Sequence, residues 1–306
     1  MPNVYGFDFA VQDESGFLDA QRQVDIFRAV AAIANALSDN GALPQGLDAS
    51  VAARLARIDA NVSGNVRNLR AENNATTPAA KVDVTWSELG MGGYLSSNFT
   101  GTCDLAAVGL NGRDTSAALA TGWYYLHAVY NPSTRTAGLL FSASSSAPSL
   151  GHATLAGFTV ARFLGEWRQT GTTAALKRQW QQNDHMYVTG DDVGANWVAV
   201  GGVTATTTWT TPATLNTWLP PTTRVALLGG NVLAGTVGVI LSLRQKGLSG
   251  NGVSVISQLA LSGFGYGRPV WLPLSASQEF EWRASANSSG TATLVYADVL
   301  AWQVPI

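Results

Sequence analysis

The chain has 306 residues, of which 46% are hydrophobic and only 12% are charged. Its net charge is −2 and it has no long basic run, so we expect no binding of nucleic acid through phosphates. Cys103 is the only cysteine, which excludes disulfides within the chain and cysteine-based zinc sites. We expect no metal and no cofactor.

The N-terminal stretch MPNVYGFDFAVQDESG lacks a basic region followed by an apolar region, so we expect no signal peptide. The apolar runs of the chain are short and broken by glycine or serine, so we also expect no insertion into a membrane. These features indicate a soluble protein that is made in a cytoplasm.

Residues 1–42 are predicted to form an attachment region that contains one helix. Tyr5, Phe7 and Phe9 alternate with other residues, as in an extended arm with an aromatic face. Residues 17–38 place apolar side chains on one broad helical face, and Asp39-Asn40-Gly41 ends that helix. This face either packs within its own domain or docks into a larger assembly.

Residues 43–74 are predicted to form a stalk helix with one apolar seam. The seam residues are spaced 4, 4, 3, 4, 4 and 3 apart, which is close to the repeat of a straight helix. They are Leu47, Val51, Leu55, Ile58, Val62, Val66 and Leu69. A single helix with so narrow a seam is not stable alone, so we expect copies of the chain to cover it in a coiled coil. Packing against the chain's own domains is the alternative.

Beyond the linker NNATTPAA, the apolar pattern changes to a period of two, which is typical of strands. Residues 75–189 are predicted to form a first β domain, with strands in KVDVTW, GWYYLHAVYN, TAGLLFSAS, FTVARFLGEWRQ and LKRQWQQNDHMYV. Residues 190–306 are predicted to form a C-terminal β domain with six or more short strands. The expected fold class is therefore α+β, mostly β: a helical anchor and stalk followed by two antiparallel domains of the β-sandwich or jelly-roll kind.

The ten tryptophans divide into two groups. The first group lies within periodic strands and is expected in the core: Trp86, Trp123, Trp167, Trp180, Trp282 and Trp302. Trp197, Trp209 and Trp218 lie in a weakly patterned stretch, where an exposed indole could stack on a sugar ring or fill an interface. Asp191 and Asp192 lie in a glycine-bounded loop that could bind sugar hydroxyls or a cation, or could be a solvated turn.

The chain shows no sequence motif of a nucleotide-binding, hydrolase or metalloprotease site. Glu279 and Glu281 lie on one face of a predicted strand, and paired carboxylates can serve a glycosidase. However, Phe280 and Trp282 fill the opposite face, so an ordinary amphipathic strand accounts for the pattern. We therefore predict that the protein is not an enzyme.

Residues 74–180 resemble a module of tailed-bacteriophage fibre and spike proteins. The resemblance rests on NNATTPAAKVDVTW, on GRD at 112–114 followed by WYYLHAVYN at 123–131, and on FTVARFLGEWRQTGT. In this sequence Gly151-His152 replaces the proline that usually follows the position of Leu150. The last 85 residues resemble the carboxy-terminal β domains of the same proteins more weakly.

The resemblance implies a virion component without a cofactor, usually a homotrimer, on a phage or a phage-derived particle. Residues 1–42, with Tyr5, Phe7, Phe9 and Phe17, would then attach to other virion proteins, and the β domains would contact host surface polysaccharide. The short chain favours a head spike or a short fibre. Two alternatives are a purely structural decoration or adaptor protein without a ligand, and a polysaccharide depolymerase.

Overall fold

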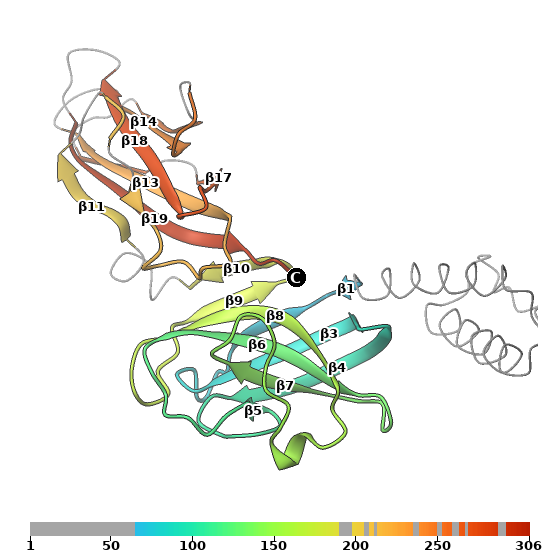
Figure 1. The fold of residues 1–306 in the computed structure, drawn as a ribbon. Coiled ribbons are helices and arrows are strands. Elements are labelled where there is room, and N and C mark those ends of the chain that lie inside the picture. Colours follow the sequence, from blue (N-terminus) through green and yellow to red (C-terminus); the bar gives the residue numbers. More distant parts are fainter. Residues whose placement is uncertain are drawn as a thin grey trace, which may run out of the picture. The chain divides into compact units, whose positions relative to one another are not determined.

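A computed structural model describes residues 65–189, 198–204, 208–210, 213–234, 239–249, 253–258, 263–266, 269–286 and 292–306 (Figure 1). The chain divides into two compact units. One unit consists of residues 1–65 and 89–95, and the other consists of residues 66–88 and 96–306. The features discussed below as candidate sites all lie in the second unit.

The largest sheet has eleven strands and is antiparallel in its described pairings. Its strands are β1 (Val66–Arg67), β2 (Arg70–Asn73), β3 (Lys81–Met91), β4 (Tyr94–Asp104), β9 (Gln179–Gln182), β10 (His185–Val188), β11 (Val198–Thr204), β13 (Val225–Ala234), β16 (Gly263–Tyr266), β17 (Val270–Pro273) and β19 (Ala292–Gln303). The spatial order is β1-β3-β2-β9-β10-β19-β13-β16, while β4 pairs with β3, β11 with β19 and β17 with β13.

Two four-stranded sheets complete the described architecture. The first has the order β5-β7-β6-β8 and the second has the order β12-β18-β14-β15. Their strands are β5 (Gly112–Arg113), β6 (Gly122–Asn131), β7 (Thr136–Ser142), β8 (Val160–Gln169), β12 (Ala213–Thr214), β14 (Val239–Gln245), β15 (Val253–Gln258) and β18 (Glu279–Ala286). A 3₁₀ turn, η1 (Ala153–Leu155), follows β7 and contributes Leu155 to a small core beside Val129 and Leu140.

The inner face of the eleven-stranded sheet is buried against β6 and β8. Cross-strand pairing places Ala71, Gln181, Met186 and Trp302 in one row, and all four side chains are buried. The Trp302 ring meets that of Trp123 on β6 edge-on at 5.7 Å between centroids. The opposite, outer face of the same strands is therefore the one left available to a ligand.

The predicted fold class is wrong in its helical part. In the described ranges every element is a strand except the short turn η1, so neither a helical anchor nor a helical stalk is present there. The expectation of antiparallel β structure is confirmed in its coarse form. The predicted attachment residues Tyr5, Phe7, Phe9 and Phe17 lie outside the described residues.

The end of the predicted stalk is β structure, for a local reason. Val66 belongs to β1, and Leu69 is fully buried beside β2. Asn68 adopts a positive φ of 53°, which helical residues do not have, and the next three residues alternate between buried and exposed, as in a strand. The helical spacing thus ends in a period of two. The other seam residues, Leu47, Val51, Leu55, Ile58 and Val62, lie outside the described residues.

Three predicted strands, β6, β7 and β8, are confirmed at nearly their predicted bounds, while β3 begins at Lys81 as predicted but runs on to Met91. The stretch LKRQWQQNDHMYV was expected to be one strand, but it is the hairpin β9–β10, with Asn183 and Asp184 at the turn. The predicted division of the β region after residue 189 stays a prediction. In the structure, β10 pairs directly with β19 in one sheet. Among the described residues, no helix is long and apolar enough to cross a membrane.

Candidate functional site

The hairpin β9–β10 buries amides and turns aromatic rings outward. Gln179 and Gln181 are at most 1% exposed, whereas Trp180 between them is half-buried on the outer face. On β10, Met186 is buried, and its neighbours His185 and Tyr187 are half-buried on the outer face. An apolar ring on the outer face of a strand whose inward side chains are amides is the reverse of the usual alternation.

The buried amides are held by the backbone of β8. The Gln181 Nε2 group donates to the carbonyl of Leu164 at 2.5 Å and to that of Asn183 at 2.8 Å. The Gln179 Nε2 group donates to the Glu166 carbonyl at 3.2 Å, and its Oε1 accepts from the Arg168 amide at 3.1 Å. These bonds fix the face of β9 that points inward, so Trp180 must point outward.

The outward rings form a continuous row, which we call the aromatic ladder: Trp180, Tyr187, His185 and Trp271. Trp180 and Tyr187 are cross-strand partners and stack at 4.2 Å between centroids, with 11° between their planes. The His185 ring lies 6.3 Å from that of Tyr187 and meets Trp271 edge-on at 5.1 Å. The ladder thus joins β9 and β10 to β17, which is about 90 residues away in sequence.

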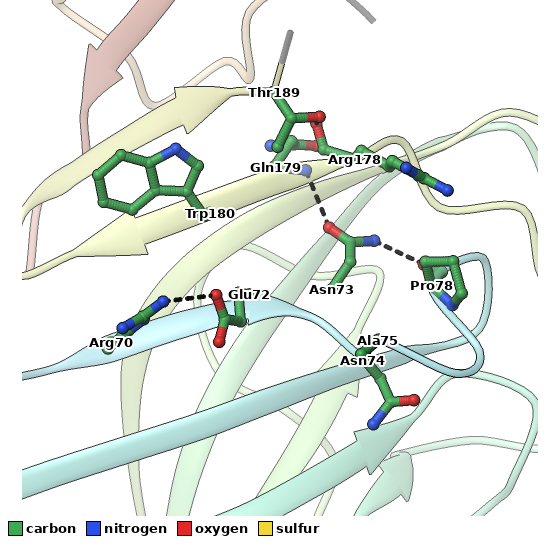
Figure 2. Close-up of a pocket in the computed structure, with 10 residues that line it drawn as sticks. All are labelled: Arg70, Glu72, Asn73, Asn74, Ala75, Pro78, Arg178, Gln179, Trp180 and Thr189. Carbon is green, nitrogen blue, oxygen red and sulfur yellow. Dashed lines mark hydrogen bonds and ion pairs between the residues drawn. The ribbon is translucent and has the colours of Figure 1, made fainter. Parts of the chain in front are cut away.

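A groove of about 450 Å³ borders Trp180. It is lined by Arg70, Glu72, Asn73, Asn74, Ala75, Pro78, Arg178, Gln179, Trp180 and Thr189. Figure 2 shows the indole of Trp180 and the Arg70–Glu72 pair beside each other, while the Arg178 side chain points away from Trp180. Cross-strand pairing places Glu72 on one side of Trp180 and Tyr187 on the other. One face of the indole therefore stacks on Tyr187, and the other faces the groove.

The asparagines of the groove are structural. The Asn73 side chain donates to the Pro78 carbonyl at 2.6 Å and accepts from the Gln179 amide at 2.8 Å (Figure 2). Asn74 Oδ1 accepts from the amides of Thr76 and Thr77 and so holds the turn after β2. The groups that remain to face a ligand at Trp180 are its indole and the ion pair of Arg70 with Glu72, while Arg178 lines the groove but points away from Trp180 (Figure 2).

That ion pair presents both hydrogen-bond donors and acceptors. Arg70 Nη2 lies 2.9 Å from Glu72 Oε2, and both side chains are substantially exposed. The second carboxylate oxygen and the remaining guanidinium N–H groups can accept and donate toward the groove. Together with the indole, the pair offers one apolar plane and two polar groups of opposite charge.

A second polar group lies at the turn of the hairpin. Asp184 Oδ1 is 2.7 Å from His185 Nδ1, and Gln303 Nε2 donates to Asp184 Oδ2 at 3.1 Å. Partial burial acts to raise the pKa of Asp184, but the Gln303 hydrogen bond and the neighbouring His185 outweigh it and hold the pKa below its usual value. The carboxylate is thus kept charged and oriented.

The tryptophans predicted to bind sugar have other surroundings. The ring of Trp209 lies under the guanidinium groups of Arg244 and Arg283, at 4.0 Å and 4.7 Å from the ring centroid. Trp218 is half-buried, and the guanidinium carbon of Arg168 lies 5.8 Å from its ring. The structure does not bring these two rings into the groove. Trp197, Asp191 and Asp192 lie outside the described residues, and all five stay predictions.

The paired carboxylates of β18 are both engaged with cations. Glu279 accepts from Lys246 Nζ at 2.8 Å, and that bond, with one from Ser277, lowers its pKa. Glu281 pairs with Arg244 at 2.5 Å. These are ordinary cross-strand ion pairs of an amphipathic strand. No group of three or more histidines, cysteines and carboxylates gathers in the described ranges as a metal site would require.

Sequence reasoning missed most of the site. Trp180 was expected in the core, and Arg70 and Glu72 fell within the predicted stalk. A signal was present in QWQQNDHMY, because the glutamines flank the tryptophan at alternate positions and Asn-Asp is typical of a turn. The contribution of Trp271 depends on pairing with distant strands and has no local signal.

Comparison of the sequence with models of known protein families and with curated proteins finds no match. The structural arrangement therefore has to be interpreted from its own chemistry.

Proposed function

We propose that the protein binds polysaccharide of a host cell surface through the aromatic ladder and its groove, without catalysing a reaction. The observation that carries the proposal is the outward position of Trp180. The same strand buries two glutamines, whose amides need hydrogen-bond partners inside the protein. It leaves a large apolar ring at the surface beside a groove.

The chemistry of the groove matches a sugar ring better than other ligands. A pyranose has an apolar face of C–H groups that packs on an indole, and its hydroxyls both donate and accept hydrogen bonds. Trp180 supplies the plane, Glu72 supplies an acceptor and Arg70 supplies donors. The volume is in the range of small-molecule sites, roughly 300–1,000 Å³.

The particle assignment rests on the resemblance of residues 74–180 to phage fibre and spike proteins. We propose that the protein is a homotrimeric component of a phage or phage-like virion, attached to other virion proteins through residues 1–42. A shallow groove bordered by a single indole gives weak affinity per site, and several copies on a particle raise avidity by orders of magnitude. Light scattering on the full chain is expected to give three times 32.1 kDa.

The test is a glycan array of bacterial surface polysaccharides, probed with the full-length protein and two matched variants. Trp180→Ala removes the indole at the groove, and Trp218→Ala removes a half-buried indole elsewhere. We expect binding by the wild type and by Trp218→Ala, and a loss of at least about tenfold for Trp180→Ala. Circular dichroism on each variant checks that the strands are retained.

The opposite results identify the rival functions. Binding that survives in Trp180→Ala but is lost in Trp218→Ala would place the sugar at the site predicted from sequence. No binding by an intact oligomer to any polysaccharide would favour a purely structural decoration or adaptor protein. Shortening of the bound polysaccharide during incubation would show a depolymerase and contradict the absence of catalysis.

A further inference from the structure

We propose a second sugar subsite at the turn end of the β9–β10 hairpin, so that the ligand is an extended chain and not one terminal sugar. The inference rests on the proposed function, because it extends the same outer face. Its residues are Trp271, Asp184, Arg224 and Gln303.

Trp271 continues the surface on which Trp180 lies. Pairing runs from Trp180 to Tyr187, then through Ala301 and Leu227 to Trp271, so all five residues share one face of the sheet. Trp271 is 38% exposed, and among the described large apolar side chains only Leu248 is also exposed. Ala301, which lies on the same face, is fully buried.

A second groove of about 320 Å³ opens next to the turn. Its lining includes Asp184, Arg224, Gln303, Pro305 and Ile306. Asp184 is held by Gln303 and His185, as described above. Arg224 is also held in place, since its Nη1 donates to the carbonyls of Pro221 at 2.8 Å and Thr223 at 2.9 Å. A carboxylate and a guanidinium are therefore oriented before any ligand arrives.

The two grooves lie on opposite sides of the hairpin. The first groove is lined by Arg70 and Glu72 of β2, which pairs with β9, and the second groove is lined by Gln303 of β19, which pairs with β10. Three strand spacings separate β2 from β19, which is about 14 Å across the sheet. The aromatic ladder occupies the surface between them. One sugar ring cannot reach both grooves, whereas a linked chain lying along the ladder can.

The charges point to a chain rich in hydroxyls and not to a polyanion. Each groove contains a carboxylate beside a guanidinium: Glu72 with Arg70 in the first, which Arg178 also lines on the side away from Trp180, and Asp184 with Arg224 in the second. A repeating anionic polymer would meet one like charge in each groove, while sugar hydroxyls can accept from the cation and donate to the carboxylate. We therefore infer an extended chain of neutral sugars.

The experiment measures affinity against fragment length. Fragments of the strongest array hit, from monosaccharide to octasaccharide, are titrated calorimetrically into the full-length wild type, Trp271→Ala and Leu248→Ala. The expected result is a wild-type affinity that rises over the first few sugar units and then levels off. Trp271→Ala is expected to lose about tenfold on the long fragments and to match the wild type on the shortest one that binds. Leu248→Ala, which removes the other exposed apolar side chain, is expected to follow the wild type throughout.

Two results would overturn the inference in distinguishable ways. Affinity that is independent of length, with Trp271→Ala unchanged, would remove the second subsite and leave polysaccharide binding at Trp180 intact. Absence of any array hit would contradict the proposed function itself, and the second subsite with it. Equal losses on short and long fragments in a folded Trp271→Ala protein would also reject a separate subsite.

Discussion

Two neighbouring regions of the molecule use aromatic residues in opposite ways. In the sheet formed by β5, β7, β6 and β8, aromatic side chains such as Phe141 and Trp167 are fully buried and meet edge-on at 6.2 Å between centroids. In the hairpin β9–β10, Trp180 and Tyr187 stack on the outer face while glutamines take the buried positions. The first arrangement stabilises a core, and the second gives up apolar burial to keep a surface of aromatic rings.

The contrast shows that residue type alone does not decide which tryptophan is structural. Both Trp167 and Trp180 lie within strands, and both were expected in the core. What separates them is the hydrogen bonding of their neighbours, because the inward amides of β9 donate to backbone carbonyls of β8, with a second bond from Gln181 to Asn183.

The largest expected effect comes from removing one ring from each region. Trp167→Ala deletes a fully buried side chain and is expected to cost about 4 kcal/mol of unfolding free energy. Trp180→Ala removes a half-buried ring and is expected to cost less than about 1.5 kcal/mol, since part of the ring is already in water. Urea unfolding followed by circular dichroism measures both. Equal losses of unfolding free energy in the two variants would contradict the difference between the buried and the outward aromatic rings.

The second effect concerns Glu166, the buried carboxylate on β8. Its side chain accepts hydrogen bonds from Thr222 Oγ1 and, at 3.3 Å, from Trp302 Nε1, and burial raises its pKa from 4.5 to about 7. The folded state therefore holds a proton that the unfolded state releases between these two pKa values. As pH rises through this window stability falls, by on the order of 3 kcal/mol in total for a shift of this size.

Glu166→Gln removes this pH dependence. The amide oxygen can accept from Trp302 and the amide nitrogen can donate to Thr222, so the contacts remain. Denaturation midpoints at about pH 5.5 and about pH 8.5 are expected to favour the variant increasingly at the higher pH. The wild type minus variant difference isolates Glu166 from His127, whose burial lowers its pKa to about 4 and acts in the opposite direction. A pH-independent difference would show that Glu166 does not titrate in this range.

A third, smaller effect tests how tightly β8 holds β9. A Cβ at Gly165 would lie 2.2 Å from Gln181 Oε1, and Gln181 cannot move without breaking its bonds to two carbonyls. Gly165→Ala is expected to cost about 2 kcal/mol of unfolding free energy. Gly122→Ala is the matched control, because a Cβ there meets no atom within 4 Å. Similar stability of both variants would mean that the amide of Gln181 is loosely held.

The smallest expected effect on stability comes from the groove itself. Arg70→Gln removes an exposed ion pair with Glu72 and should change unfolding free energy by less than about 0.5 kcal/mol. The same change is expected to weaken polysaccharide binding several-fold by calorimetry. Arg67→Gln, which removes the exposed partner of Glu88, serves as control and should leave binding unchanged. A stability loss in Arg70→Gln without a binding loss would assign Arg70 to the fold alone.

The sequence was sufficient to predict a strand where the strand's own residues show the pattern of apolar side chains and flanking turn residues. The run GWYYLHAVYN is apolar on both faces and bounded by turn residues, and it forms β6 at Gly122–Asn131. The aromatic ladder was not predictable in this way. The ladder depends on β10 pairing with β19 and on β13 pairing with β17, and the first two strands are more than 100 residues apart in sequence. The register between strands so distant in sequence cannot be predicted from a local pattern of residues.

The most direct test of the outward aromatic face is a crystal structure of the full-length protein with the best-binding oligosaccharide from the array. We expect a sugar ring packed parallel to the face of Trp180 that is not covered by Tyr187, with its hydroxyls bonded to Glu72 and Arg70. A ligand seated elsewhere with this groove empty, or a Trp180 side chain buried by its own chain in the crystal, would contradict the account.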